Sequence, residues 1–190
     1  MKIGLFFGSF NPIHIGHLVI ASTIVETTDL SEIWFVVSPK NPLKSSKSLL
    51  HEFDRYDMVQ RAIDDDFRFR VSDVEFNMPR PSYTSDTLAY LSDKHKDKQF
   101  ELIIGEDNLA SFTKWKNYEA ILENYGLVVY PRPNTAESKV KSHRNVKIVE
   151  APLLDISATF IRKLAKQDRS IKYLVPQAVE ELIAAKKYFQ

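Results

Sequence analysis

The chain has 190 residues, of which 44% are hydrophobic and 27% charged, so it can bury a full globular core and does not have the composition of a disordered protein. Its formal net charge is only +1, with 26 basic and 25 acidic residues, which argues against a nucleic-acid partner, and the lack of cysteine excludes disulfides, thiolate chemistry and cysteine-ligated zinc. No apolar run approaches the roughly 18 residues that span a membrane, and no signal peptide is recognisable. We therefore expect a cytoplasmic protein with no membrane partner.

The N-terminal stretch combines a strand, a glycine-containing turn and the start of a helix. Residues 3–7 form a short apolar run that predicts one buried strand, and GSFNP at residues 8–12 predicts a turn. A helix is expected from about residue 17 to 28. This arrangement presents backbone N–H groups and a helix N-terminus to a phosphate. His14 and His17 stand at the helix start, three residues apart and therefore on one face.

The rest of the chain alternates short apolar strands with helical patterns. We expect strands at residues 33–37, 67–74, 100–104, 127–130 and 146–149, and helices at about 51–64 and 84–94 and from Asn117, Ser157 and Pro176 onward. In the 84–94 helix, Leu88, Ala89 and Leu91 are expected to be buried. Residues 106–108 are expected to lie in a turn.

This alternation predicts an α/β fold with a Rossmann-like, doubly wound, mostly parallel sheet and helices on both faces. No convincing linker interrupts the sequence. We therefore expect residues 1–190 to form a single domain, with the C-terminal helical part, about 157–190, packed on the same domain.

Open α/β sheets bind ligands beyond the carboxyl ends of their strands. The segments that follow the apolar strands at that edge are 8–17, 38–44, 105–108 and 131–133, and each holds glycine, polar or charged residues. We expect these four segments to gather at one edge of the sheet. The chain has neither the GxGxxG nor the GxxxxGK[ST] pattern, which disfavours a dinucleotide dehydrogenase and a P-loop enzyme.

The two histidines allow more than one interpretation. Imidazoles beside a glycine-containing turn can donate to phosphate oxygens where negative charge builds up in a transition state. An isolated HxxH pair can equally be structural, with one ring capping the helix and the other packed, or it can bind a metal ion. Since no third ligand stands nearby in the sequence, we expect no metal site made by protein side chains.

A second segment, ISATFIR at residues 156–162, combines two hydroxyl groups with an arginine. Ser157 and Thr159 stand where a helix is expected to begin, and Arg162 follows about one turn later. Such a helix start suits the outer phosphates of a triphosphate. Taken alone, the segment is more often an N-cap beside a surface arginine.

Taken together, these segments resemble a known pattern. GSFNPIHIGH resembles the GxFxPxHxGH signature of the nucleotidylyltransferase superfamily, and ISATFIR resembles its ISSTxxR phosphate motif. PSYTSDTL at residues 81–88 resembles the PSYTxDTL stretch of bacterial nicotinate mononucleotide adenylyltransferases, and IGEDNL at 104–109 resembles their IGxDxL. Further matches, in the same order along nearly the whole chain, are Phe112 with Trp115 and Lys116, Arg132 with Pro133, and YLVP at 173–176.

The resemblance implies adenylyl transfer from ATP to nicotinate mononucleotide, giving deamido-NAD and pyrophosphate, with Mg²⁺ carried by the phosphates. The implied catalytic residues are His14, His17 and Arg162. The implied ATP contacts are Gly8, Ser9, Phe10, His17, Gly105, Asp107, Ser157, Thr159 and Arg162. The implied contacts of the mononucleotide are Asn41, Lys44, Tyr83, Thr84, Trp115 and Arg132.

One segment departs from the family pattern. Where members usually read PNxxPPHK, this chain reads PKNPLK at residues 39–44, which is shorter and has Leu43 in place of the usual histidine, so Asn41 and Lys44 rest on a weaker match. Two other functions stay open at this point. One is another transferase of the superfamily, such as a phosphopantetheine adenylyltransferase, and the other is a non-catalytic nucleotide sensor. The oligomeric state also stays open.

Overall fold

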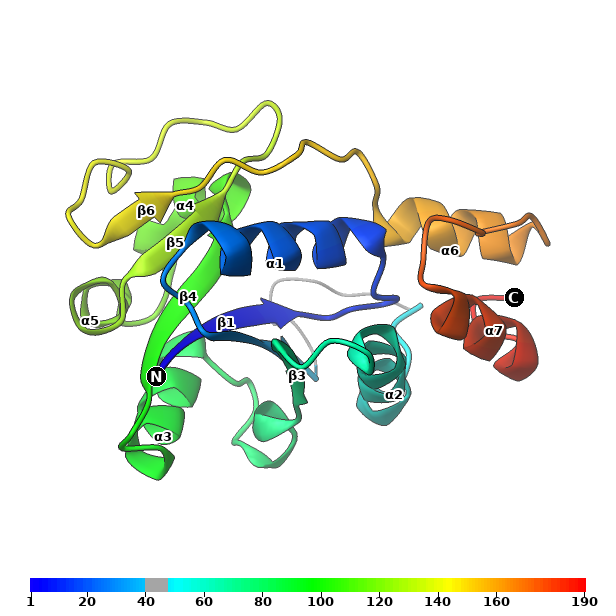
Figure 1. The fold of residues 1–190 in the computed structure, drawn as a ribbon, viewed down its shortest axis with the longest axis horizontal. Helices are drawn as coiled ribbons and strands as arrows, with labels where there is room; N and C mark the ends of the chain where they lie inside the picture. The colour runs from blue at the N-terminus through cyan, green and yellow to red at the C-terminus, as the bar shows by residue number, and fades with distance from the viewer. Residues whose placement is uncertain (40–47) are drawn as a thin grey trace.

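The computed structural model describes residues 1–39 and 48–190, and in this part of the chain six parallel strands form one sheet in the order β3–β2–β1–β4–β5–β6 (Figure 1). The strands are β1 (Lys2–Gly8), β2 (Glu32–Val37), β3 (Phe69–Ser72), β4 (Gln99–Gly105), β5 (Leu127–Tyr130) and β6 (Val146–Ile148). The strand order reverses between β1 and β4, which is where ligand crevices open in sheets of this kind. The predicted Rossmann-like α/β fold is confirmed.

Helices cover both faces of this sheet. They are α1 (Ile15–Thr27), α2 (Glu52–Ile63), α3 (Thr84–Lys94), α4 (Glu106–Ser111), α5 (Tyr118–Asn124), α6 (Ala158–Lys166) and α7 (Gln177–Lys186), with two 3₁₀ turns, η1 (Val74–Asn77) and η2 (Phe112–Lys114). No helix within residues 1–39 and 48–190 is long and apolar enough to cross a membrane.

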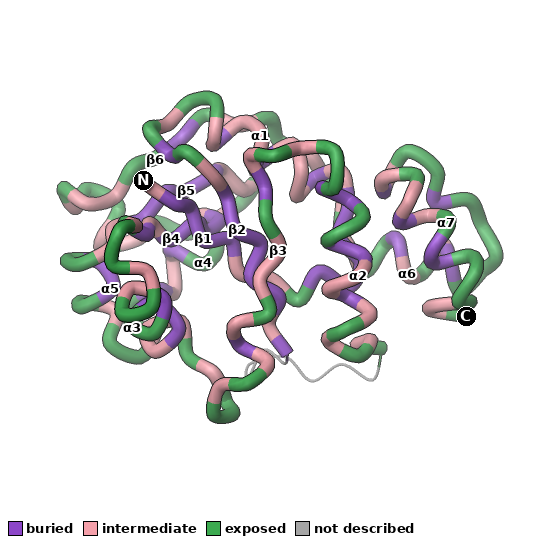
Figure 2. Tube along the Cα trace, turned by 60° about the horizontal axis from the view of Figure 1, so that its bottom comes forward, coloured by how far each residue is buried: buried purple, intermediate pink, exposed green. Residues whose placement is uncertain are grey.

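Successive side chains of β2 enter two different cores. Ile33 and Phe35 pack with α1, α2, α6 and α7, whereas Trp34 and Val36 pack with α3, α4 and α5. Neighbouring residues of a strand point to opposite faces, so a sheet covered on both sides needs a continuous apolar run instead of alternation. Figure 2 shows this directly, since the central strands are mostly buried while the outer helices are exposed along one side.

The C-terminal helices stand at the carboxyl end of β1. In Figure 1, α6 and α7 lie beyond the arrowhead of β1, beside the start of α1. The backbone N–H of Ile15 donates to the carbonyl of Leu174 at 3.0 Å, which ties the start of α1 to the segment before α7. Ile161 of α6 and Val179 of α7 are fully buried in the core that α1 and α2 share. The chain end therefore closes over the edge where β1 ends.

Arg55 of α2 holds several strand ends in place. Its side chain is fully buried, and burial lowers its pKa to about 10, so it remains charged at neutral pH. Its guanidinium donates to four backbone carbonyls, those of Ser9 at 2.5 Å, Ser38 at 2.7 Å, Pro39 at 2.8 Å and Leu50 at 2.9 Å. The planar fork of an arginine can serve several acceptors at once. Arg55 thereby joins the ends of β1 and β2 to the segment that leads into α2.

Three local expectations need correction. Residues 106–108, expected in a turn, instead begin α4. Ala89 is exposed, and Thr87 is buried in its place beside Leu88 and Leu91. Asn117 does occupy the N-cap position of α5, but its backbone is left-handed with φ 55° and its side chain makes no capping hydrogen bond. In each case the expectation came from local sequence preference, and tertiary contacts decided the outcome.

Replacing Arg55 with lysine is expected to lower the free energy of unfolding by about 2–4 kcal/mol, because a single ammonium cannot serve four carbonyls and leaves buried acceptors unpaired. Urea unfolding followed by circular dichroism at pH 7 measures this. Arg61→Lys on the same helix is the matched control, since Arg61 is exposed and pairs with Asp57 at 2.9 Å, a contact worth at most about 0.5 kcal/mol. Equal losses in the two variants would contradict the role of Arg55.

Candidate active site

His14 and His17 stand together where α1 begins. His14 is the N-cap residue of α1, and its backbone N–H donates to Nδ1 of His17 at 3.2 Å. The two rings stack with their centroids 3.7 Å apart. Because Nδ1 of His17 accepts this hydrogen bond, the neutral ring carries its proton on Nε2. His17 can therefore donate a hydrogen bond through Nε2 to an anion.

Both imidazoles are neutral at pH 7. Burial, followed by the charge of Arg132, lowers the pKa of His14 to about 4. Burial, followed by the proximity of His14 and the charge of Arg132, lowers the pKa of His17 well below 6.5. Nδ1 of His14 is buried and finds no hydrogen-bond partner among residues 1–39 and 48–190. The pair thus offers directional hydrogen bonds instead of positive charge.

Two glycines allow the chain to pack closely around this pair. A Cβ on Gly16 would lie only 3.1 Å from Nδ1 of His14. A Cβ on Gly8 would lie 2.7 Å from the ring of Phe10, which is 2% exposed and sits on a backbone with φ 43°. The side chain of Phe10 therefore belongs to the core, and only its backbone remains to meet a ligand.

The C-terminal phosphate motif meets this turn. Nη1 of Arg162 donates to the carbonyl of Asn11 at 2.8 Å, and Nη2 donates to Oγ1 of Thr159 at 3.2 Å. Ser157 is the N-cap of α6, and its Oγ accepts from the N–H of Phe160 at 3.2 Å. Partial burial lowers the pKa of Arg162, but a guanidinium keeps its proton at neutral pH. A positive charge from α6 thus lies against the turn that leads to His14.

Gly105, Asp107 and Arg132 lie together at the carboxyl ends of β4 and β5. A Cβ on Gly105 would collide with the carboxylate of Asp107 and would lie 3.2 Å from Cγ of Arg132. The guanidinium of Arg132 lies over the ring of Tyr130, 5.2 Å from its centroid, and the N–H of Arg132 donates to Glu106 at 3.3 Å. Nε of Arg132 is buried without a hydrogen-bond partner in the part of the chain that the structure covers. The charge of Arg132 contributes to the lowered pKa of both histidines, so Arg132 lies near the imidazole pair.

Tyr83, Thr84 and Trp115, the predicted contacts of the pyridine ring, belong to the part of the structure around α3. Thr84 is the first residue of α3, so the N–H groups at this helix start lack partners within the helix. The ammonium of Lys116 lies 4.6 Å from the ring centroid of Tyr83 and pairs with Asp86 at 2.9 Å, which brings the Trp115 segment against α3. Trp115 itself is partly buried and packs on the core beneath α3 and α5.

The remaining predicted residues, Asn41 and Lys44, lie outside the described residues. Within the described ranges, no group of three or more histidine, aspartate or glutamate side chains could hold a metal ion. A metal that takes part in phosphate chemistry here would take most of its ligands from phosphate oxygens and water.

Sequence reasoning missed Asn11 and Arg55. Asn11 is buried, and its side chain donates to the carbonyl of Ser48 at 2.9 Å and accepts from the N–H of Leu50 at 3.2 Å. The signal for Arg55 was available, since a charged residue stands on the same helical face as Met58 in the buried stripe of α2. No local signal distinguishes Asn11 from an ordinary turn residue.

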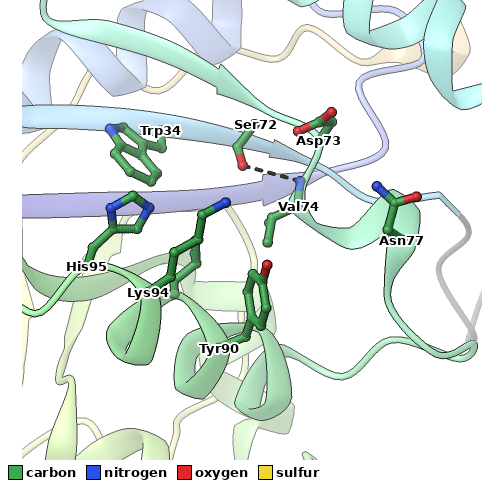
Figure 3. A pocket seen from close by; sticks show the side chains of 9 residues that line it. Trp34, Ser72, Asp73, Val74, Asn77, Tyr90, Lys94 and His95 are labelled. Carbon is green, nitrogen blue, oxygen red and sulfur yellow. Dashed lines mark hydrogen bonds between the residues drawn. The ribbon is translucent and has the colours of Figure 1, made fainter.

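A surface groove beside α3 does not coincide with this site (Figure 3). It is lined by Trp34, Ser72, Asp73, Val74, Asn77, Tyr90, Leu91, Lys94 and His95. None of these belongs to the predicted catalytic or substrate-binding residues. The convergent polar groups at the carboxyl edge of the sheet therefore identify the candidate site better than concavity does.

Comparison with known proteins places the chain in a family. A family model described as cytidylyltransferase-like matches residues 5–164. A Cytophaga hutchinsonii protein named "Probable nicotinate-nucleotide adenylyltransferase" is 62% identical over 189 residues, which cover 100% of this chain and 98% of that protein. This chain belongs to the nicotinate-nucleotide adenylyltransferases of the cytidylyltransferase-like family.

Other members are similar over their whole length. A Flavobacterium psychrophilum protein of the same name is 47% identical over 100% of both chains. The solved structure of Plasmodium falciparum nicotinic acid mononucleotide adenylyltransferase complexed with NaAD has a TM-score of 0.81, with 20% identity, over 99% of this chain and 97% of that one. At that identity the likeness establishes the shared fold, and the family assignment rests on the sequence relatives.

The histidine pKa values predict how stability depends on pH. The unfolded chain takes up a proton at His14 near pH 6.5, whereas the folded chain does so only near pH 4, so the free energy of unfolding should fall as the pH drops between these values. The contribution of His14 is about 3 kcal/mol in total and is fully present above pH 6.5. Urea unfolding at pH 7 and pH 4.5 measures it, and His14→Gln should show a smaller difference. The same difference in both proteins would mean that the folded His14 titrates normally.

Proposed function

We propose that this chain transfers the adenylyl group of ATP to nicotinate mononucleotide, giving deamido-NAD and releasing pyrophosphate, as a step of NAD biosynthesis. The hydrogen bond from Arg162 to the carbonyl of Asn11 carries this proposal, because it joins the imidazole pair near one end of the chain to the phosphate motif near the other. The activity in the names of its sequence relatives supports the same reaction.

The chemistry is a single in-line displacement. A phosphate oxygen of the mononucleotide attacks the α-phosphorus of ATP, the bond from that phosphorus to the bridging oxygen breaks, and pyrophosphate leaves with the bonding electron pair. Since the nucleophile is already anionic, the protein need not supply a strong base. Catalysis then rests on alignment, worth up to about 7–11 kcal/mol, and on stabilising the charge that develops around the α-phosphorus.

The neutral imidazoles suit that second task. Nε2 of His17 donates to a non-bridging oxygen of the α-phosphate, and His14, stacked against it, fixes the ring and adds a second donor. Arg162 supplies the positive charge that the departing pyrophosphate requires, with Ser157 and Thr159 at the start of α6 as further donors.

The other assignments follow from position. The backbone of Gly8, Ser9 and Phe10 approaches the ATP phosphates, and Gly105 with Asp107 meets the ribose of ATP, where a carboxylate accepts from sugar hydroxyl groups. Arg132 could meet either the phosphate or the carboxylate of the mononucleotide, and its place near the histidines favours the phosphate.

Tyr83, Thr84 and Trp115 receive the pyridine ring. The N–H groups of Tyr83 and Thr84 at the start of α3 bind its carboxylate, and the indole of Trp115 offers a flat face for the ring. Asn41 and Lys44 are proposed as further contacts of the mononucleotide.

We also assign Mg²⁺ to the reaction, bound mainly through the phosphates of ATP. Its ligands would be phosphate oxygens and water, which fits the lack of a three-residue ligand cluster in the described ranges. Bound there, the ion shields the negative charge that the nucleophile must approach. A reaction that consumes ATP to supply NAD points to the cytoplasm as its compartment.

Replacing His17 with alanine is expected to lower kcat by about 10²–10³ while the KM for ATP changes less than about threefold, because the lost bond acts mainly in the transition state. Pyrophosphate release measures both constants. His143→Ala is the control, since His143 pairs with Glu123 and belongs to no proposed contact. Turnover within a few-fold of the unmodified enzyme would rule out the role of His17.

A panel of acceptors tests the proposed reaction itself. Nicotinate mononucleotide should give a kcat/KM at least about tenfold above that of nicotinamide mononucleotide, because an amide NH₂ would face the N–H donors of Tyr83 and Thr84. Phosphopantetheine should give no pyrophosphate. Preference for phosphopantetheine, or ATP binding without any pyrophosphate release, would contradict the proposal and favour another transferase or a sensor.

A further inference from the structure

Glu75 is a buried carboxylate to which the mechanism gives no role. It lies in η1 and is only 3% exposed, and it accepts a hydrogen bond from Oγ1 of Thr87 at 2.8 Å. Burial raises its pKa, while hydrogen bonds from the hydroxyls of Ser38, Thr87 and Ser82 act in the opposite direction. This carboxylate accepts from α3 through Thr87, and the hydroxyls of Ser38, at the end of β2, and Ser82, in the loop before α3, lie close enough to affect it.

Two of these donors flank the turn that is assigned to the pyridine carboxylate. Ser82 directly precedes Tyr83. Thr87 is fully buried, its N–H donates to the carbonyl of Tyr83 at 3.1 Å, and its Oγ1 lies 3.3 Å from the same oxygen. Glu75 therefore holds the turn through Thr87, which follows Thr84, while the hydroxyl of Ser82, which precedes Tyr83, lies close to the same carboxylate.

The third donor connects the turn to the strand ends. The hydroxyl of Ser38 lies close to Glu75, while the carbonyl of Ser38 accepts from Arg55 at 2.7 Å. A carboxylate offers about four acceptor positions, so it can serve three hydroxyls at once, whereas the single oxygen of an amide cannot do so in the same way. An apolar residue at position 75 would fill the same space, but it could not accept the hydrogen bond that fixes the orientation of the turn.

We propose that Glu75 is a positioning residue that orients the 82–84 turn, so that the N–H groups of Tyr83 and Thr84 meet the carboxylate of the pyridine ring, and that it thereby sets the preference for the acid over the amide. This inference rests on the proposed function. Glu75 touches no substrate in this scheme and acts only through the turn. Binding of ATP, which is assigned to His17 and Arg162, should depend little on Glu75.

Thr87→Val tests the proposal with the least disturbance, because valine keeps the shape of threonine and removes only the hydroxyl. Thr87→Ser keeps the hydroxyl and is its matched control, and Glu75→Gln tests the carboxylate itself. The measurements are the Kd of nicotinate mononucleotide by calorimetry, the KM for each substrate by pyrophosphate release, and the melting temperature.

Thr87→Val and Glu75→Gln should raise the Kd and the KM for nicotinate mononucleotide by about tenfold and lower the acid-to-amide ratio of kcat/KM by a similar factor. The KM for ATP should stay within about twofold, and Thr87→Ser should resemble the unmodified enzyme. If these two variants had a lower melting temperature but an unchanged Kd for nicotinate mononucleotide and an unchanged acid-to-amide ratio, Glu75 would only stabilise the fold. That result would overturn the proposal. An equal rise in both KM values would overturn it too.

The same data separate this inference from the proposed function. An unmodified enzyme that binds ATP but neither binds nicotinate mononucleotide nor releases pyrophosphate with it would end both. An active enzyme whose Thr87→Val and Glu75→Gln variants keep their affinity and their acid-to-amide ratio would end only the positioning role of Glu75.

Discussion

The site depends on one hydrogen bond between residues 151 positions apart, from the guanidinium of Arg162 to the carbonyl of Asn11. The acceptor is a neutral backbone group, so the bond fixes the direction of the arginine without cancelling its charge. A carboxylate in that place would hold the side chain as firmly but would compete with the phosphates for it. The same logic applies to Arg132, whose guanidinium lies over the ring of Tyr130. Both cations are held by groups that leave their charge available to an anion.

The histidines complement these arginines. Burial and the charge of Arg132 keep His14 and His17 neutral, and a neutral ring can accept from the N–H of His14 at one nitrogen while it donates from the other. A protonated His17 could not accept that bond, and the capping geometry at the start of α1 would be lost. In the proposed reaction, the arginines would supply the long-range attraction for the triphosphate, and the neutral imidazoles would supply hydrogen bonds of defined direction.

The sequence predicted the strands because they are encoded locally, whereas the contact residues stay a prediction. Continuous apolar runs such as residues 33–37 mark a strand buried on two faces, and the two motifs mark segments that the hydrogen bond from Arg162 to Asn11 joins. The sequence-based prediction failed for residues whose burial depends on a contact with a residue distant in the sequence. Ala89 was assigned to the core of α3, but Thr87 is buried instead, because its hydroxyl meets the buried carboxylate of Glu75. The turn expected at 106–108 became α4 for a similar reason, since local polarity there does not reveal helix packing.

The buried polar residues that sequence reasoning missed, Asn11, Arg55 and Glu75, share a physical role. Each bonds to backbone groups or hydroxyls from segments that are distant in sequence, and each lies behind a turn that carries proposed contacts. Apolar packing sets how closely two elements approach but leaves rotation of a turn weakly determined, whereas a hydrogen bond to a specific carbonyl or hydroxyl also fixes its direction. Backbone N–H groups that must meet a phosphate or a carboxylate need that direction. Burying these charged and amide side chains costs desolvation free energy. Their hydrogen bonds offset that cost, and they also orient the backbone that faces the ligand.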